Sequence, residues 1–366
     1  VSGASVLNAS ASRIDLTTNG ANNDFGGAVS LINTGANAVT ITDANAIILG
    51  PSSVGSTLTV TATTGGISDS GNITVAGSST FSAANSSVIL DSTGSDFTGD
   101  VTFSGSSLEN VTIVDNSAFD LQALTLSGAL NLTSGGAITQ SGSLLVGATS
   151  AFNAGANTID LTTNGASNNF TGAVSLTNTG TNAVTITDTD ALMFDVLSIA
   201  AGDLIVESSG ALNLGLGTVG GALVATSNDS AITQTDALLV TGTTNINAGR
   251  STIDLASNGA SNNFTGAVSL TNTGTNTVAI NDTDALTLGV LSIAAGDLTV
   301  QSSGALNLGQ GAVGGALVAT SGNGAVSQSG TLEVTGTTSI NAGSSSIDLT
   351  TNGTNNNFTG AVSVTN

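Results

Sequence analysis

Two short acidic motifs are the best candidates for chemistry in this sequence of 366 residues. Asp188-Thr189-Asp190 and Asp282-Thr283-Asp284 each place two carboxylates two residues apart. Side chains at positions i and i+2 of an extended segment lie on the same face. Each pair could therefore bind calcium, or act as the acid and base of glycoside hydrolysis. The candidate ligands of a weak calcium site are Asp188, Asp190, Asp282 and Asp284.

Internal copies of the sequence test these pairs. The first carboxylate recurs in every copy, as Asp43, Asp115, Asp188 and Asp282. The second position varies, and holds Asn45, Ser117, Asp190 and Asp284. Exchange among Asp, Asn and Ser is typical of a turn or of a hydrogen bond to the backbone, whereas a metal site or an acid/base couple tolerates it poorly. We therefore predict a structural role for these residues, with calcium binding and catalysis as alternatives, and we assign no catalytic or cofactor-binding residue.

The remaining charged positions and the composition restrict the chemistry further. Asp15, Asp160, Asp254 and Asp348 alternate with apolar residues, which predicts a solvated outer face. The sequence has no Cys, His or Lys and only two Arg, with a net charge of -22. Thiolate and imidazole chemistry and nucleic-acid binding are therefore excluded. No run of 18 apolar residues is present, which argues against membrane insertion.

These acidic residues belong to a repeat. Phe170, Phe264 and Phe358 share the frame Asn-Asn-Phe-Thr-Gly-Ala-Val-Ser and are 94 residues apart, whereas Phe25 and Phe97 mark shorter copies of 72 and 73 residues. We predict a single array over residues 1–366. Its copies are approximately 14–86, 87–157, 158–251 and 252–345, with a partial copy at 346–366.

The difference in copy length indicates a solenoid. A whole coil is the unit that a solenoid can gain without disturbing its neighbours, so about 22 residues is one coil. The long copies then contain four coils and the short ones three, although five and four coils of about 19 residues fit as well. The predicted fold is all-β, a β-solenoid (parallel β-helix) with rungs of about 19–24 residues.

Positions that exchange only among large apolar residues identify the core. They are Val75, Val146, Val240 and Val334, and Phe81, Phe152, Ile246 and Ile340. Asn-Gly pairs predict the corners, where a left-handed backbone is expected. These pairs are Asn19-Gly20, Asn164-Gly165, Asn258-Gly259 and Asn352-Gly353. The single proline agrees with this fold, because a central parallel strand must donate its N–H.

The repeat resembles the repeat regions of filamentous-haemagglutinin-like adhesins, which are secreted by the two-partner pathway or as autotransporter passengers. The motifs that carry the resemblance are residues 296–308 (Gly-Asp-Leu-Thr-Val-Gln-Ser-Ser-Gly-Ala-Leu-Asn-Leu), 136–142 (Gly-Ala-Ile-Thr-Gln-Ser-Gly) and 246–249 (Ile-Asn-Ala-Gly). The resemblance implies a right-handed parallel β-helix at the surface of a Gram-negative-type bacterium. It also implies that the chain is part of a longer secreted protein, with a role in attachment or matrix building.

The first functional hypothesis is therefore a non-enzymatic stalk or filament segment of an extracellular adhesin. Its expected partners are further copies of itself or sibling rods joined end to end, or host and matrix glycans, with no cofactor. The alternatives are a glycan- or calcium-binding face and, third, a carbohydrate-active β-helix enzyme. The enzyme is disfavoured because the chain has no Trp or Tyr on which a sugar could stack.

Overall fold

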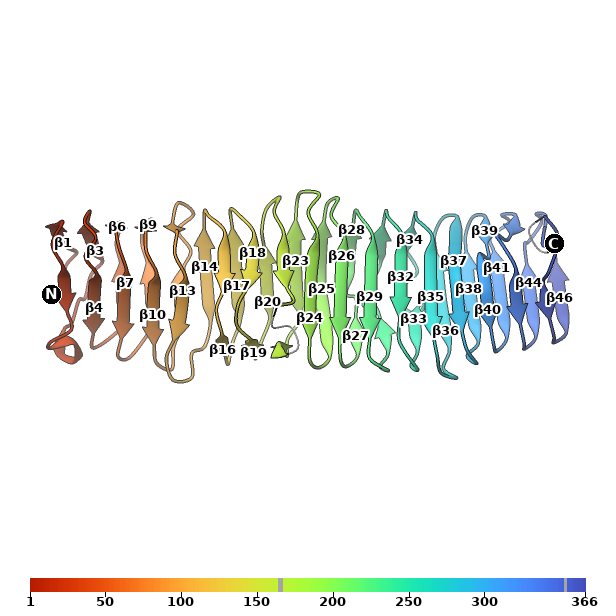
Figure 1. The fold of residues 1–366 in the computed structure, drawn as a ribbon, viewed down its shortest axis with the longest axis horizontal. Helices are drawn as coiled ribbons and strands as arrows, with labels where there is room; N and C mark the ends of the chain where they lie inside the picture. The colour runs from red at the N-terminus through yellow and green to blue at the C-terminus, as the bar shows by residue number, and fades with distance from the viewer. Residues whose placement is uncertain (164–166, 352–353) are drawn as a thin grey trace. The chain divides into compact units, whose positions relative to one another are not determined.

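The computed structural model describes residues 1–163, 167–351 and 354–366. The chain divides into two compact units, Val1–Asn178 (unit 1) and Thr179–Asn366 (unit 2). Each unit is a parallel β-solenoid, and together they contain about 17 turns. Within each unit the strands of successive turns lie side by side (Figure 1). The predicted all-β solenoid is confirmed, whereas the single continuous array over residues 1–366 stays a prediction.

Unit 1 is built from parallel ladders of short strands, in which each strand pairs with the equivalent strand one coil later. One ladder contains β2 (Ile14–Leu16), β4 (Val39–Asp43), β7 (Leu58–Ala62), β10 (Ser79–Ala83), β13 (Val101–Ser104), β15 (Phe119–Leu121), β18 (Ile138–Gln140) and β21 (Ile159–Leu161). A second contains β5 (Ile47–Leu49), β8 (Ile67–Asp69), β11 (Val88–Leu90), β14 (Val111–Asp115), β17 (Leu130–Ser134), β20 (Ser150–Asn153) and β23 (Val174–Asn178). The remaining side is formed by β1 (Ser5–Ser10), β3 (Val29–Asn33), β6 (Ser52–Val54), β9 (Ile73–Val75) and β12 (Asp96–Phe97), and by the three-stranded group β16 (Leu124–Leu126), β19 (Leu144–Val146) and β22 (Asn169–Phe170).

Unit 2 has the same construction. Its first ladder contains β24 (Val184–Asp188), β26 (Leu204–Ser208), β29 (Leu223–Ser227), β32 (Thr244–Asn247), β35 (Val268–Asn272), the end of β37 (Leu286–Ile293), β40 (Gln310–Val313), β43 (Leu332–Val334) and β45 (Asn357–Phe358). The second contains the start of β25 (Leu192–Ile199), β27 (Leu212–Asn213), β30 (Ile232–Thr233), β33 (Ile253–Leu255), β36 (Val278–Asp282), β38 (Leu298–Ser302), β41 (Leu317–Ser321), β44 (Thr338–Asn341) and β46 (Val362–Thr365). The remaining side holds the end of β25 with β28 (Leu216–Val219), β31 (Leu238–Val240) and β34 (Asn263–Phe264), and the start of β37 with β39 (Leu306–Asn307) and β42 (Val326–Ser327). In the described residues the only helix is the short 3-10 turn η1 (Gly20–Asn22).

The strand register corrects the predicted number of coils in each copy. In unit 2, Val184 pairs with Leu204, and four such steps along the same ladder end at Val268. Val278, which is 94 residues after Val184, lies on the next ladder, between Ile253 and Leu298. A long copy is therefore four turns and a third, and neither four nor five.

The short copies of unit 1 behave in the same way. Three steps lead from Val39 to Val101, and Val111, which is 72 residues after Val39, lies on the next ladder. The difference of 22 residues is thus one coil, as predicted. Each copy is turned by about a third of a revolution relative to the copy before it in the same unit, so equivalent residues of consecutive copies face different sides.

Period-two alternation places the core as predicted. All eight core residues identified from the copies are at most 1 % exposed. Phe81 makes two aromatic contacts, edge-on to Phe97 at 5.8 Å and stacked on Phe103 at 6.0 Å between ring centroids. Pro51 lies between β5 and β6, outside the strands. Filling the interior with apolar side chains on three sides is what stabilises each coil.

The pairs Asn19-Gly20 and Asn258-Gly259 lie in turns between strands, as predicted, but the left-handed backbone predicted for them is wrong. Gly20 and Gly259 do not have a left-handed backbone; glycine is required at 259 because a Cβ there would lie 2.4 Å from the Leu255 carbonyl oxygen. The pairs Asn164-Gly165 and Asn352-Gly353 lie outside the described residues. Left-handed glycines occur instead in the Asn-Ala-Gly motif, at Gly155, Gly249 and Gly343, with φ of 54°, 56° and 62°. Their N–H groups donate to the Asn two residues earlier.

Candidate functional site

The two acidic pairs that the sequence singled out do not meet in the structure. Asp188 ends β24 on the first ladder of unit 2, and Asp282 ends β36 on the second. The strand ends after the first Asp of each pair, so the two carboxylates diverge. Asp188 and Asp282 are 0 % and 3 % exposed, whereas Asp190 and Asp284 are exposed. Among the described residues, no group of three or more acidic side chains could hold a metal ion.

The buried aspartate is a clamp between coils. In unit 2, Asp282 Oδ2 accepts a hydrogen bond from the N–H of Phe264 at 2.7 Å, and Oδ1 accepts one from the N–H of Asp284 at 2.7 Å. Phe264 belongs to the preceding coil. Both oxygens are thus occupied by backbone donors, which stabilises a carboxylate that is out of contact with water.

The same clamp recurs in unit 1. Asp43 accepts from the N–H groups of Phe25 and Asn45, both at 2.8 Å. Asp115 accepts from the N–H groups of Phe97 at 2.9 Å and Ser117 at 3.3 Å. We call Asp43, Asp115, Asp188 and Asp282 the aspartate clamps; Asp188 Oδ1 likewise accepts from the N–H of Asp190, at 2.7 Å.

The clamp explains the pattern of exchange among copies. At the second position only the backbone N–H is needed, so Asn, Ser and Asp are equivalent there. Burial raises the pKa of Asp115 and Asp282, and the N–H groups of Phe97 and Phe264 oppose that shift. Hydrogen bonding to the backbone is therefore the common role of the first aspartate in these copies.

A second set of carboxylates caps turns at the surface. Asp15, Asp160, Asp254 and Asp348 (the aspartate turn caps) each accept hydrogen bonds from residues two or three positions later. In Asp160, Oδ1 accepts from the N–H of Thr162 at 3.1 Å and from its hydroxyl at 2.6 Å. Asp15 and Asp348 are exposed and the other two are half-buried, in line with the predicted outer position.

At Asp15, Asp254 and Asp348 the local hydrogen bonds stabilise the charged form of the side chain. The hydroxyl of Thr17 is the main cause of a lowered pKa at Asp15, and the hydroxyl of Thr351 has the same effect at Asp348. Burial raises the pKa of Asp254, but the hydroxyl and N–H groups of Ser257 outweigh it, so the net shift is downward.

Buried amide pairs were missed by the sequence analysis. Gln234 and Asn262 exchange two side-chain hydrogen bonds of 2.7 and 3.0 Å, and the Asn262 oxygen also accepts from the N–H of Leu238. Equivalent pairs are Gln140 with Asn168 and Gln328 with Asn356. The recurrence of both members every 94 residues was the available signal.

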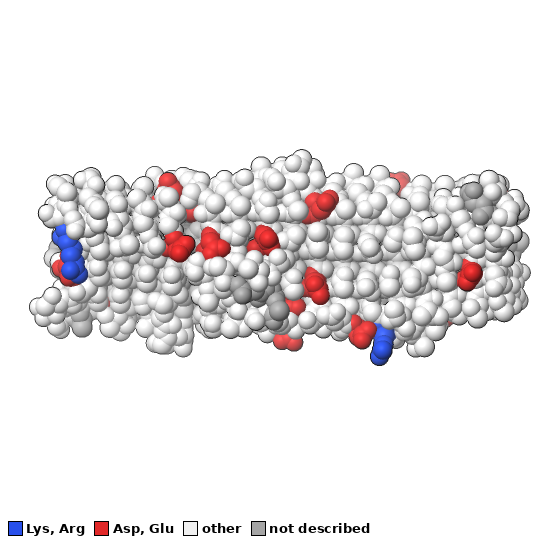
Figure 2. All heavy atoms as spheres, viewed as in Figure 1, with Lys and Arg blue, Asp and Glu red and all other residues white. Residues whose placement is uncertain are grey.

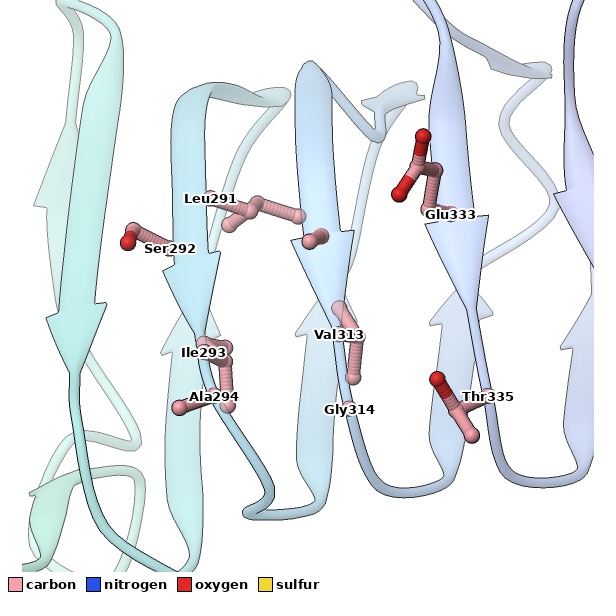
Figure 3. Close-up of a pocket in the computed structure, with 9 residues that line it drawn as sticks. Leu291, Ser292, Ile293, Ala294, Val313, Gly314, Glu333 and Thr335 are labelled. Carbon is pink, nitrogen blue, oxygen red and sulfur yellow. The ribbon is translucent and has the colours of Figure 1, made fainter.

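A shallow groove lies on the surface of unit 2. It has a volume of about 200 Å³ and lies over β37, β40 and β43 (Figure 3). Glu333 extends from β43 toward β40, whereas Ser292 on β37 points away from it (Figure 3). The polar groups therefore do not converge as they do in an enclosed ligand site.

Acidic side chains on the visible face of each unit are scattered mostly one at a time (Figure 2). Arg13 pairs with Asp15 at 2.7 Å, and Arg250 contributes its N–H, not its guanidinium, to a hydrogen bond with Asp229. Among the described residues, no helix has the length and apolar character required to cross a membrane.

Comparison with known proteins identifies the repeat. No curated protein and no solved structure matches the chain. The family model "Repeats of unknown function (DUF5649)" matches residues 1–32, 36–104, 108–177, 201–271, 275–306 and 295–365. Two matches overlap at residues 295–306, within the additional coil of a long copy. Because the matches cover most of the sequence, the chain belongs to this family of repeats.

Proposed function

We propose that the chain is a non-enzymatic structural segment of an extracellular bacterial adhesin, in which the stacked coils give reach and rigidity. The observation that carries the proposal is the aspartate clamp. Asp43, Asp115 and Asp282 each use a buried carboxylate to hold the backbone of the preceding coil, so these recurring acids serve cohesion between coils.

Two further features support a mechanical role. The parallel ladders satisfy backbone N–H and C=O groups from coil to coil, and the amide pairs add side-chain hydrogen bonds between adjacent coils. The acidic surface opposes lateral aggregation of exposed strands. The surface of a Gram-negative-type bacterium, and end-to-end partners, follow from the resemblance to filamentous-haemagglutinin-like adhesins.

Deleting a copy tests the stalk directly. Removal of residues 184–277 joins Ala183 to Val278 and replaces each strand by its equivalent, so the ladders are preserved. In a surface-displayed chain with a fused tip, the tip should move toward the cell by about 20 Å, since coils are about 4.8 Å apart, while tip affinity is unchanged. Unaltered tip height, or hydrolytic release of sugar by the full chain, would refute the proposal.

The groove of Figure 3 favours a second candidate, binding of a polar glycan. Glu333 supplies a carboxylate beside small residues, Ala312 and Gly314, that leave the strand surface open. A glycan-array signal that Glu333→Gln removes and that Glu207→Gln, on β26, preserves would support this candidate over a purely structural role.

A further inference from the structure

Unit 1 carries a regular array of hydroxyl groups on one outer face. Along β4, β7, β10 and β13, the outward residues form two columns in direct register. One column is Thr40, Thr59, Thr80 and Thr102, and the other is Thr42, Thr61, Ser82 and Ser104. We name these eight residues the hydroxyl face.

The geometry of the hydroxyl face is fixed by the fold. Neighbouring strands are about 4.8 Å apart and residues i and i+2 about 6.6 Å apart, so the hydroxyls repeat in two directions. The Thr side chains are β-branched and therefore stiff at χ1. Beneath them the alternate residues, such as Val60 and Phe81, are fully buried in the core. The array is thus held in place before any ligand arrives.

The hydroxyl groups remain available to solvent. Within the part of the chain that the structure describes, the side chains of Thr40, Thr59, Thr80 and Thr102 make no hydrogen bond to another residue. The outward positions of these four strands hold no charged residue. Over the strands labelled β7 and β10 in Figure 1, the surface in Figure 2 is uncharged. The array ends at the Arg13–Asp15 ion pair on one side and at β15, with Asp120, on the other.

The same regularity is absent from the corresponding column in unit 2. On the first ladder of unit 2, the corresponding outward residues are Thr185, Ile205, Val224 and Asn245. A sugar or peptide site is usually concave and combines a few different polar groups with apolar or aromatic ones. An uncharged array of Thr and Ser hydroxyls in register instead matches a ligand whose own donors and acceptors repeat in two dimensions.

We infer that the hydroxyl face binds ice, through ordered water held between its two columns. Each hydroxyl can donate and accept, and preorganisation of the array lowers the cost of ordering the waters. This activity is separate from the proposed stalk function, and either one can fail without the other.

The test uses the full chain and single ice crystals observed under a microscope. The wild-type chain should produce faceted crystals and a gap between melting and growth temperatures. Thr59→Lys should reduce that gap about tenfold or more, as expected when over 1.4 kcal/mol of binding is lost. Thr299→Lys is the matched control, because Thr299 is the outward second residue of β38 between two buried residues, as Thr59 is in β7; it should leave the gap unchanged.

Thr59→Val guards against misfolding, since Val is of similar shape and favours strands. It should also diminish the gap while leaving the circular dichroism spectrum as in the wild type. Round crystals with the wild-type chain, or equal loss with Thr59→Lys and Thr299→Lys, would overturn the inference. The inference would also be overturned if the chain had no effect on ice but bound a β-glucan, or a second copy of itself, in a manner that depends on Thr59.

Discussion

The aspartate clamps and the aspartate turn caps use the same side chain in opposite ways. A clamp such as Asp282 is buried and joins two coils through the N–H of Phe264, whereas a turn cap such as Asp254 is half-buried and bonds only to the next few residues of its own coil. Burial raises the pKa of the first and local hydrogen bonds lower the pKa of the second. What an aspartate contributes to stability therefore depends on where its hydrogen-bond donors lie. A donor in the preceding coil makes the aspartate a link between coils, whereas donors in its own turn make it a local cap.

The largest expected effect comes from removing a clamp. Asp282→Ala leaves the N–H groups of Phe264 and Asp284 without their acceptor in a buried site, which should cost about 3 kcal/mol of unfolding free energy. Asp254→Ala should cost about 1 kcal/mol, because the donors of its turn can bond to water. Urea unfolding followed by circular dichroism measures the unfolding midpoint of each variant. Equal shifts from the wild-type midpoint would contradict the distinction between clamps and turn caps.

The unfolding free energy lost on breaking an amide pair should fall between the losses for Asp282→Ala and Asp254→Ala. Gln234→Leu removes both hydrogen bonds to the Asn262 side chain and should cost about 2 kcal/mol. Gln301→Leu is the matched control, since Gln301 is an exposed residue of β38, and should change the unfolding midpoint little. A smaller shift for Gln234→Leu than for Gln301→Leu would contradict the role given to the pair.

The pH dependence of Asp282 and Asp254 should have opposite signs. A raised pKa means that Asp282 contributes stability below its unfolded pKa and loses it as the pH rises through its folded pKa. Asp282→Asn should therefore be more destabilising at about pH 3 than at about pH 7. Asp254, with a lowered pKa, contributes stability above its unfolded pKa and loses it as the pH falls, so Asp254→Asn should show the reverse. If the destabilisation by Asp282→Asn and by Asp254→Asn changed with pH in the same direction, the opposite pKa shifts given to Asp282 and Asp254 would be wrong.

The smallest effect is expected outside both sets. Asp284 is exposed, and its side chain accepts one hydrogen bond, from Asn263. Asp284→Ala should change the unfolding free energy by less than about 0.5 kcal/mol. Because the oxygens of Asp282 are occupied by N–H groups, calcium should not raise the melting temperature. A calcium-dependent rise that Asp284→Ala removes would restore the calcium hypothesis.

The fold could be predicted from the sequence because its signals are local and repeated. Alternation around Val75 and Phe81 and their equivalents identifies the core, and a 22-residue difference between copies identifies a coil. The extra third of a turn in each copy could not be predicted, because it depends on strand register, and a repeat length shows only how far the sequence recurs.

The candidate site was predictable in role but not in geometry. Exchange among Asn45, Ser117 and Asp284 predicted a turn or a hydrogen bond to the backbone, and in the structure the N–H of this position donates to the first aspartate. The partner of the clamp is the N–H of a Phe 18 residues earlier, as Phe264 is for Asp282. A backbone donor leaves no trace in the sequence. The Gln234–Asn262 pair spans 28 residues, a separation that becomes a contact only once the coil length is known.

Amide hydrogen exchange at Phe264 tests most directly the claim that the buried carboxylates hold coils together. In the wild-type chain this N–H should be strongly protected, and Asp282→Ala, which removes both acceptor oxygens, should accelerate its exchange together with that of Asp284, while Asp254→Ala leaves both unchanged. Rapid exchange of Phe264 in the wild-type chain, or protection that persists in Asp282→Ala, would contradict the account.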